Sequence, residues 1–251
     1  MMSETATNRT FDDDPKSYSL DLATLTPGEQ EALDRDGYVV FPGVIDAAWL
    51  DSLRNAFEEA SGSALREIKE SGTRQIKDLV STDPVFEGIY THPMILAAVF
   101  QVLRCVFRLG QMNGRDPLPG FGQQGLHPDW MARAKGEPFR IVTTICLLDD
   151  FTENNGATRL VPGTHRLLTP PPKSLAAPAN RHPEQKIVVA RAGSVLAFNG
   201  HLWHSGTRND TSLPRRVLQC SYVGRDELRF GRAMSDAPDG LSRAARYILG
   251  V

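Results

Sequence analysis

The stretch LHPDW, residues 126–130, places a histidine and an aspartate two positions apart. Side chains at positions i and i+2 of an extended segment project to the same side, so His127 and Asp129 can reach one metal ion together. An imidazole and a carboxylate are both ligands that suit Fe(II). The pair alone is a weak indication, because a chain of 251 residues brings histidines near acids by chance. A metal site therefore requires a further ligand downstream.

Two histidines downstream are the next possible ligands. They are His201 and His204 in FNGHLWHSG, residues 198–206, which follows the predicted strand RAGSVLAF. Sites of this kind commonly lie in the mouth of a β-barrel. Two histidines and one carboxylate occupy one face of an octahedral Fe(II) and leave the other face open for a co-substrate and dioxygen. Because His201 and His204 are three positions apart, they cannot share one face of a strand, and only one of them is expected to bind the metal.

A co-substrate such as 2-oxoglutarate also needs a cation for its distal carboxylate in a largely buried pocket. Arginine suits this role because its planar guanidinium matches a carboxylate with two hydrogen bonds. The segment LPRRVLQCSYV places Arg215 and Arg216 eleven and twelve residues after His204. If this segment is a strand, the two arginines point to opposite faces, so only one of them can enter the site.

The first half of the chain carries the signals of helices. A helix is predicted from Thr26, where TPGE forms a capping-box pattern, to Gly37. The short strand YVVFPGVI follows, and a longer helix is predicted from Asp46 to about residue 70. The segment DPVFEGIYTHPMILAAVFQVLR predicts two helical pieces that are divided at His92.

Beyond residue 105, short apolar runs alternate with Gly, Pro, Asn and Asp. The predicted strands are FRIVTTICLLDDF, ATRLVPG, QKIVVARAGSVLAFNG and RRVLQCSYVG, a spacing typical of a sandwich or barrel rather than of β-α-β units. Residues 170–183, PPPKSLAAPANRHP, are predicted as a mobile surface loop. The expected fold class is mainly β with flanking helices: a double-stranded β-helix (a cupin-like jelly roll) with a helical N-terminal part. Residues 1–20 are predicted to be a disordered leader, and residues 21–251 to form a single domain.

Composition narrows the possible partners. The net charge of −2 gives no general attraction to nucleic acid or to an anionic membrane. No apolar run approaches the length needed to span a bilayer. The three cysteines, Cys105, Cys146 and Cys220, are far apart and form no CxxC pair, which disfavours a disulfide framework and a zinc ribbon. The sequence predicts a cytoplasmic protein that binds a small molecule and binds neither nucleic acid nor a membrane.

Several segments, in order along the chain, resemble the phytanoyl-CoA dioxygenase-like (PhyH) family of Fe(II)/2-oxoglutarate-dependent oxygenases. They are LHPDW, DFTENNGATRLVPGTHR, RAGSVLAFNGHLWHSG and the arginine that follows. The segment LTPGEQEALDRDGYVVFPGVIDAAWLDSLR resembles the N-terminal opening of that family, so the resemblance covers roughly residues 24–225. It implies the double-stranded β-helix that the strand pattern predicts. The implied reaction is oxidative decarboxylation of 2-oxoglutarate coupled to hydroxylation of a substrate.

The resemblance also implies roles for single residues. His127, Asp129 and His204 match the metal ligands of the family. Arg215 matches the arginine that holds the distal carboxylate, at the spacing of eleven residues after the last histidine. Lys77, in RQIKDLVSTDP, roughly matches a lysine that contacts 2-oxoglutarate in some members.

Two features of the pocket are less closely matched. Gln124 precedes the His-x-Asp pair and is a candidate for contacting 2-oxoglutarate or ordering the metal site. Many relatives carry a tryptophan in the strand before DDFT, whereas this chain has Ile145 and Cys146 there. The wall of the pocket is therefore expected to differ.

These residues predict a non-haem iron dioxygenase that uses Fe(II), 2-oxoglutarate and O2, with ascorbate as a candidate reductant. It is expected to hydroxylate a small molecule (a natural-product or metabolic intermediate) and to release succinate and CO2. Asp129 disfavours halogenation, because related halogenases have Gly or Ala at that position. Desaturation, ring closure and epoxidation are alternative outcomes of the same chemistry. The rival functions are a cupin-like metal enzyme that does not use 2-oxoglutarate and a non-catalytic binding protein on the same scaffold. Neither the substrate nor the oligomeric state is indicated.

Overall fold

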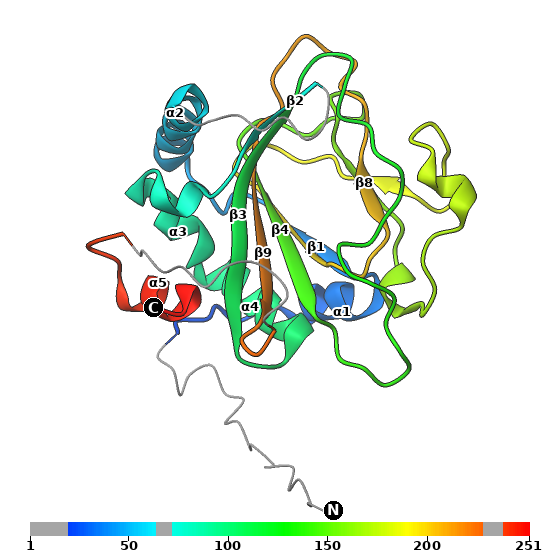
Figure 1. The fold of residues 1–251 in the computed structure, drawn as a ribbon, viewed down its shortest axis with the longest axis horizontal. Helices are drawn as coiled ribbons and strands as arrows, with labels where there is room; N and C mark the ends of the chain where they lie inside the picture. The colour runs from blue at the N-terminus through cyan, green and yellow to red at the C-terminus, as the bar shows by residue number, and fades with distance from the viewer. Residues whose placement is uncertain (1–19, 64–71, 228–237) are drawn as a thin grey trace, which may run out of the picture.

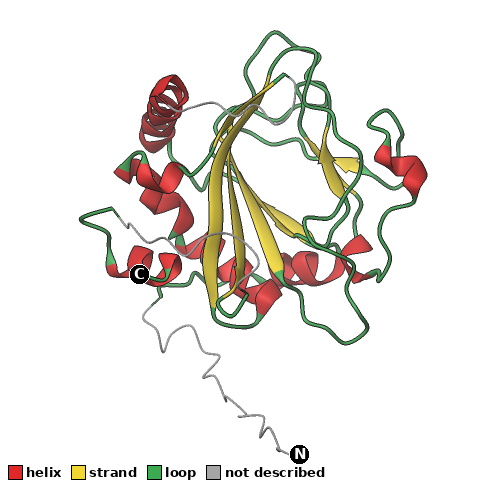
Figure 2. Ribbon diagram, viewed as in Figure 1, coloured by secondary structure: helices red, strands yellow, loops and turns green. Residues whose placement is uncertain are grey.

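The computed structural model describes residues 20–63, 72–227 and 238–251. In these residues two antiparallel β-sheets face each other, and most helices lie on the outer side of the larger sheet (Figure 1). Figure 2 shows the strands in the middle of the molecule, with the small sheet connected through long loops. The predicted leader lies outside the described residues except for its last position. The prediction that residues 21–251 form a single domain stays a prediction.

The large sheet has six strands in the spatial order β1-β7-β4-β9-β3-β2. Every neighbouring pair is antiparallel. Strand β4 is buried along its whole length because α4 packs on its outer side and the small sheet faces its inner side. The strands are β1 (Tyr38–Phe41), β2 (Thr73–Ile76), β3 (Phe107–Pro117), β4 (Ile141–Leu147), β7 (Val195–Asn199) and β9 (Val217–Gly224).

The small sheet has three short strands in the order β6-β5-β8. They are β5 (Thr158–Leu160), β6 (Lys186–Ile187) and β8 (His204–Gly206). An isolated antiparallel bridge between His127 and His204 adds the segment before β4 to the free edge of β8. The small sheet therefore carries two of the histidines that the sequence singles out.

The helices begin and end at recognisable sequence signals. At the start of α1 the Thr26 side chain accepts a hydrogen bond from the Glu29 backbone, and Glu29 reciprocates, which confirms the predicted capping box. His92 caps α4 with its own ring nitrogen, which confirms the predicted division at that residue. The helices are α1 (Pro27–Arg35), α2 (Ala47–Ser63), α3 (Glu87–Tyr90), α4 (Pro93–Leu103) and α5 (Arg243–Leu249), with short 3-10 turns at Leu79–Ser81, Pro84–Phe86, Thr164–Arg166 and Lys173–Ala176.

Helix α4 forms the centre of the hydrophobic core on the outer side of the large sheet. Its sequence is almost wholly apolar, and Ile95, Ala98 and Val99 are fully buried against β4, β7 and β9. Within the described residues, no single helix has the length and apolarity to cross a membrane; residues 84–90 and 93–103 meet the criterion only as a pair bent by 42°.

The structure contains two strands that the sequence pattern did not predict. Strands β2 and β3 have no counterpart among the predicted strands, although β3 pairs with β9 along nearly its whole length. The loop 170–183 lies on the surface, as predicted, and its mobility stays a prediction. Arg159 contacts this loop: its guanidinium donates hydrogen bonds to the carbonyls of Pro178 and Asn180, and Leu175 is buried.

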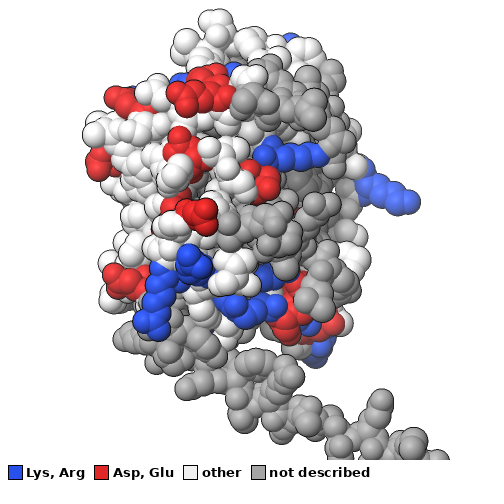
Figure 3. Space-filling model, turned by 60° about the vertical axis from the view of Figure 1, so that its left-hand side comes forward, with Lys and Arg blue, Asp and Glu red and all other residues white. Residues whose placement is uncertain are grey.

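The outer face that carries α2, α3 and α5 shows acidic and basic side chains in separate small groups (Figure 3). Neither sign forms a continuous field over the described residues on this face, in keeping with the small net charge of the chain. The charged groups whose position has a chemical consequence lie between the sheets.

Gly193 is predicted to be required where the turn before β7 packs against the turn after β1. Its carbonyl accepts a hydrogen bond from the amide of Ile45. Its φ of +84° lies in the left-handed region, and an added Cβ would lie 2.5 Å from the carbonyl oxygen of Ile45. We expect Gly193→Ala to lower the free energy of unfolding by about 2 kcal/mol or more. The measurement is a thermal melt followed by circular dichroism, with an expected fall in Tm of at least about 4 °C.

Gly28→Ala is the matched control. Gly28 lies in the first turn of α1, and an added Cβ there would meet nothing within 4 Å. The same substitution should leave Tm unchanged or raise it, because alanine favours a helix by up to about 1 kcal/mol over glycine. Equal effects at the two positions would contradict the backbone argument.

Candidate active site

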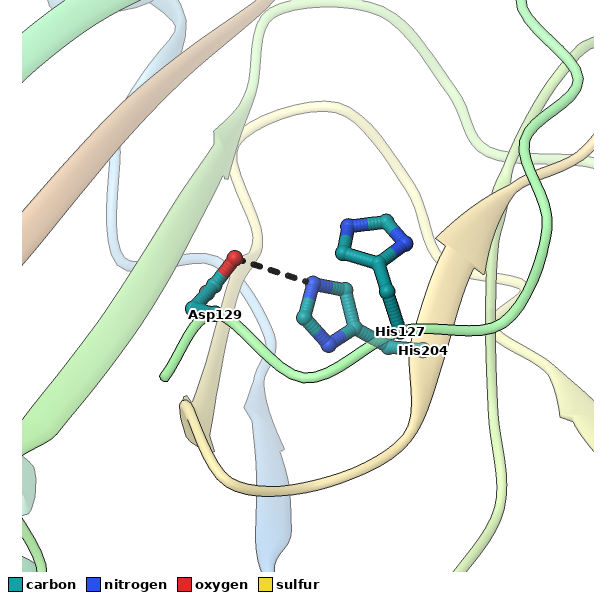
Figure 4. Close-up of side chains that lie close together, drawn as sticks. All are labelled: His127, Asp129 and His204. Atoms are coloured by element: carbon teal, nitrogen blue, oxygen red, sulfur yellow. Dashed lines mark ion pairs between the residues drawn. The ribbon is translucent and has the colours of Figure 1, made fainter. Parts of the chain in front are cut away.

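A backbone bridge brings together histidines that are far apart in the sequence. The amide of His127 donates to the carbonyl of His204, and the amide of His204 donates to the carbonyl of His127, both at 3.0 Å. Side chains of directly opposed residues project to the same face of a sheet. The two imidazole rings consequently lie side by side with centroids 4.8 Å apart, facing the large sheet (Figure 4).

Both rings are oriented by backbone carbonyls. Nδ1 of His127 lies 2.8 Å from the carbonyl oxygen of Gly125, and Nδ1 of His204 lies 2.8 Å from that of Leu202. A carbonyl can only accept, so each Nδ1 carries the proton and each Nε2 keeps its lone pair. That tautomer presents both Nε2 atoms to the same space, as a metal-binding pair requires.

Asp129 completes the group from the other side (Figure 4). One atom from each of His127, Asp129 and His204 lies within 4.8 Å of the other two, a spacing that allows the three to hold one metal ion. The Asp129 backbone is held by the carbonyl of Gly200 at 2.7 Å, and its Oδ2 accepts a hydrogen bond of 2.6 Å from the Thr143 hydroxyl. Oδ1 is left to face Nε2 of His204, at 3.4 Å.

The surroundings of the three groups favour an ionised Asp129 and a neutral His127, and they make His204 easier to protonate. Burial alone would raise the pKa of Asp129, but the proximity of His204 and the hydrogen bond from Thr143 lower it to about 2. Burial lowers the pKa of His127, and its neighbour His204 lowers it further. Burial also opposes protonation of His204, but the carboxylate of Asp129 outweighs burial and raises its pKa. A divalent cation between the three groups would replace that proton.

The three residues line one cavity between the sheets. It encloses about 600 Å³, its open mouth included. Both sheets and the loop before Asp129 contribute to its wall. The lining residues are Thr73, Arg115, Pro117, Gly122, Gln124, His127, Asp129, Ile145, Thr158, Phe198, His204, Ser205, Gly206, Arg215, Val217 and Gln219.

Arg215 enters this cavity from the large sheet. It is 6% exposed, and its Nε has no hydrogen-bond partner among the described residues. Its guanidinium carbon lies 5.1 Å from the centre of the Phe151 ring. Burial lowers the pKa of Arg215 to about 9, and the nearby charge of Arg115 adds to that effect. A buried guanidinium without a carboxylate partner is costly unless an anion binds it.

Arg216 points the other way, as the alternation of side chains along a strand predicts. Its guanidinium binds both carboxylate oxygens of Asp149, with Nε and Nη2 each at 2.9 Å, and Nη1 contacts Glu58 at 3.1 Å. It does not line the cavity. Of the two arginines left open by the sequence, only Arg215 lies where it can reach a ligand beside the three candidate metal ligands.

His201, the alternative to His204, lies outside the cavity. Its Nε2 accepts a hydrogen bond of 3.2 Å from the backbone amide of Arg140, and its ring packs against Phe139. Burial, aided by the charge of Arg133, lowers its pKa to about 4. His201 therefore anchors the loop between Asp129 and β4 as a neutral side chain.

The two remaining predicted ligands of the co-substrate differ in their positions. Gln124 lines the cavity, and its side-chain oxygen accepts a hydrogen bond of 3.3 Å from the amide of Gly206. Lys77 follows the end of β2, is exposed and is not among the lining residues. The structure thus does not place Lys77 at the site: this lysine lies beyond the end of β2, whereas Thr73, at the start of that strand, lines the cavity.

Sequence reasoning missed several polar residues that line or support the site, among them Thr143, Arg115 and Thr73. Thr143 lies in TTICLL, and a hydroxyl within a buried apolar strand is a signal that could have drawn attention to it. Arg115 and Thr73 lie on β3 and β2, the two strands that were not predicted. Without those strands there was no way to know which way their side chains point.

Comparisons with known proteins identify the family of the chain. The family model described as "Phytanoyl-CoA dioxygenase (PhyH)" matches residues 33–217. The dioxygenase trt7 of Aspergillus terreus is 27% identical over 219 residues, covering 80% of this chain and 74% of that protein.

Two solved structures share the fold. HygX from Streptomyces hygroscopicus, solved with nickel, 2-oxoglutarate and hygromycin B, has a TM-score of 0.68 at 22% identity and covers 80% of this chain and 88% of its own. SnoK, a non-haem α-ketoglutarate-dependent carbocyclase from nogalamycin biosynthesis, has a TM-score of 0.67 at 20% identity, with 81% and 85% covered. The predicted double-stranded β-helix is confirmed.

Thr143 is predicted to set the metal affinity by fixing the carboxylate of Asp129. Thr143→Val keeps the shape of the side chain and removes the hydrogen bond to Oδ2. We expect the dissociation constant for Mn(II) or Fe(II) to rise about tenfold or more, as for other groups that orient metal ligands. Isothermal titration under anaerobic conditions measures it, and Thr143→Ser should restore most of the affinity.

Thr144→Val is the control for this experiment. Thr144 is equally buried in β4 and adjacent in sequence, but its hydroxyl makes no hydrogen bond to Asp129. Its replacement should leave the metal affinity unchanged. A similar loss of metal affinity in both variants would mean that the effect comes from a disturbed strand and not from the missing hydrogen bond.

His201 is predicted to make stability depend on pH. The folded protein keeps it neutral down to a pKa of about 4, whereas the unfolded chain takes up a proton near 6.5. The unfolded state therefore binds more protons in this window, and the free energy of unfolding should fall as pH drops from 6.5 to 4. The free energy of unfolding is measured by denaturant titration at several pH values between 4 and 6.5. In His201→Gln its change with pH should be smaller than in the wild type, by up to about 1.4 kcal/mol per pH unit. Identical slopes in both proteins would refute this role.

Proposed function

The chain belongs to the phytanoyl-CoA dioxygenase (PhyH) family, and from this premise we propose which residues carry its chemistry and what it acts on. It is an Fe(II)- and 2-oxoglutarate-dependent oxygenase. We propose that it hydroxylates a small molecule, with release of succinate and CO2. His127, Asp129 and His204 would bind the iron, and Arg215 would hold the distal carboxylate of 2-oxoglutarate.

The donor set fits Fe(II). Two imidazoles and one carboxylate converge on one point, and a metal ion held by these three donors would have coordination positions open for a chelating oxo acid and dioxygen. The backbone carbonyls of Gly125 and Leu202 hold the imidazoles in the tautomer that binds a metal. The hydroxyl of Thr143 holds Asp129 through one oxygen and leaves the other for the ion.

The observation that carries the proposal is the buried guanidinium of Arg215. It lies in the same cavity as the three donors, without a carboxylate partner among the described residues. A ligand with one end on the metal and an anionic far end would satisfy it. 2-Oxoglutarate has this form, because its oxo acid end chelates a metal and its other end is a carboxylate. Gln124, on the cavity wall, is proposed as a further polar contact for it.

When bound, iron and 2-oxoglutarate supply the activation of dioxygen that drives substrate oxidation. The protein supplies position and exclusion of water. Phe198 and Ile145 form an apolar part of the wall beside the imidazoles, and Phe198 packs on the ring of His204 at 4.5 Å between centroids. Such a wall keeps bulk water from the reacting centre.

The substrate is proposed to be a natural-product or metabolic intermediate. The structural neighbour HygX binds hygromycin B, and SnoK acts in nogalamycin biosynthesis. Those names support a small molecule as the substrate class and give no identity for this chain. Hydroxylation is the proposed outcome, with ring closure as the alternative suggested by the carbocyclase SnoK.

The test is a spectroscopic titration that needs no substrate. Anaerobic protein is loaded with Fe(II), 2-oxoglutarate is added, and the weak visible metal-to-ligand charge-transfer band is recorded. We expect the band in the wild type and its loss in His204→Ala. Arg215→Gln should keep iron binding but raise the dissociation constant of 2-oxoglutarate about 10- to 100-fold, the effect of losing a charge-assisted hydrogen-bond pair.

Arg216→Gln is the matched control, because it removes the neighbouring guanidinium that faces away from the cavity. It should leave the affinity for 2-oxoglutarate unchanged. Iron binding without the band in the wild type would favour a cupin-like enzyme that does not use 2-oxoglutarate. Absence of iron binding would favour a non-catalytic binding protein.

A further inference from the structure

The inner face of the large sheet carries amide side chains beside the candidate iron site. Gln219 of β9 lines the cavity and lies directly opposite Asn113 of β3. Directly opposed residues project to the same face of a sheet, so Asn113 faces the same space as Gln219. On the next strand, Gln75 is opposite Arg115, which also lines the cavity. Gln219, Asn113 and Gln75 thus form a carboxamide row across β9, β3 and β2.

One end of the carboxamide row lies next to the candidate metal ligands. On the paired strands β4 and β9, Gln219 is opposite Ile145, two residues from Thr143. Gln219 and Thr143 are therefore diagonal neighbours on the inner face. Because Thr143 holds the carboxylate of Asp129, a molecule bound along the row would have one end beside the metal.

A buried hydroxyl group lies at the other end of the row. Thr73 is two residues before Gln75, on the same face of β2, and it lines the cavity. It is 2% exposed, and its Oγ1 has no hydrogen-bond partner among the described residues. A buried hydroxyl without a partner is unfavourable, so Oγ1 offers a hydrogen bond that a ligand in the cavity would satisfy.

The chemistry of the row suits hydroxyl groups. Each carboxamide has an oxygen that accepts and an NH2 group that donates, and a hydroxyl both donates and accepts. The oxygen of Asn113 accepts a hydrogen bond of 3.2 Å from the amide of Asp78, which leaves its NH2 group as a donor. An apolar ligand would remove these groups from water without giving them partners. Neighbouring strands lie about 4.8 Å apart, so a matching ligand needs hydroxyl groups spread over roughly 10 Å.

We propose that the carboxamide row and the hydroxyl of Thr73 form a substrate subsite for a neutral molecule with several hydroxyl groups, such as a sugar, a cyclitol or a glycoside. The inference rests on the proposed function and adds the substrate class to it. Gln219 lines the cavity and would orient the part of the substrate nearest the iron. Asn113 and Gln75 are half-buried and would hold the part that lies farther from it.

The test titrates neutral polyols into the anaerobic Fe(II)–2-oxoglutarate complex. The probes are myo-inositol, methyl α-glucopyranoside and trehalose, and cyclohexanol is the comparison with a ring and a single hydroxyl group. The shift of the charge-transfer band gives each affinity. In the wild type at least one polyol should bind about tenfold or more tightly than cyclohexanol, the effect of two or more additional hydrogen bonds. Gln219→Met keeps the length of the side chain and removes its hydrogen-bonding group, so this preference should fall about tenfold.

Two further variants separate ligand binding from structural effects. Thr73→Val removes a hydroxyl that has no partner among the described residues, so the Tm of the ligand-free protein should stay the same or rise while the polyol affinity falls. Gln30→Met is the matched control for Gln219→Met. Gln30 is exposed on α1 and donates a hydrogen bond to the carbonyl of Leu25, outside the cavity, so its replacement should leave the preference intact.

Three outcomes overturn the inference. If no polyol binds the wild type more tightly than cyclohexanol, the cavity has no subsite for a polyol. If Gln219→Met weakens 2-oxoglutarate binding as Arg215→Gln does, Gln219 belongs to the co-substrate site. If Gln30→Met loses the preference as Gln219→Met does, the row does not determine it. A wild type without the charge-transfer band contradicts the proposed function instead, and calorimetry with the Mn(II)-loaded protein then decides whether the polyol subsite exists.

Discussion

The reciprocal pair of backbone hydrogen bonds between His127 and His204 is the contact on which the site depends. It joins two segments that are remote in sequence and fixes both the separation and the direction of the imidazoles. Because the atoms involved are main-chain atoms, the pairing does not rely on the identity of either side chain. Further contacts orient the side chains: the backbone carbonyls of Gly125 and Leu202 select the tautomers, and the hydroxyl of Thr143 turns the carboxylate of Asp129 toward the imidazoles.

The two sheets divide the chemistry between them. The small sheet and the loop before β4 carry the donors that suit a metal, whereas the large sheet carries the cations, Arg215 and Arg115. The large sheet can hold a buried guanidinium because its core is dense and its neighbouring acids are already engaged: Asp116 with Arg74, and Asp149 with Arg216. This arrangement keeps the guanidinium of Arg215 in the cavity without an ion pair to a carboxylate among the described residues.

Much of this was predictable from sequence, for reasons that differ from residue to residue. The cap at Thr26 and the break at His92 are local, so short-range chemistry predicts them. Strand alternation predicted that one of Arg215 and Arg216 would face inward but could not say which, and the choice of Arg215 came from the family resemblance. Strand β3 was missed because RLGQMNGRDP contains two glycines and few apolar residues; its position beside β9 makes it a strand. Arg115 and Thr73 were missed with β3 and β2, and Lys77 was misplaced for lack of the register of β2.

The metal donors and Arg215 lie on opposite walls of the cavity, and this arrangement has a consequence for the stability of the protein in a cell. A molecule that joined them would tie one sheet to the other, and it would bind the folded chain but not the unfolded one. At a hundred times its dissociation constant, such a ligand adds about 2.7 kcal/mol to the free energy of unfolding. Proteases act on the transiently opened chain, whose population would fall accordingly. The abundance of this enzyme would then follow the cellular supply of 2-oxoglutarate, without any dedicated regulator.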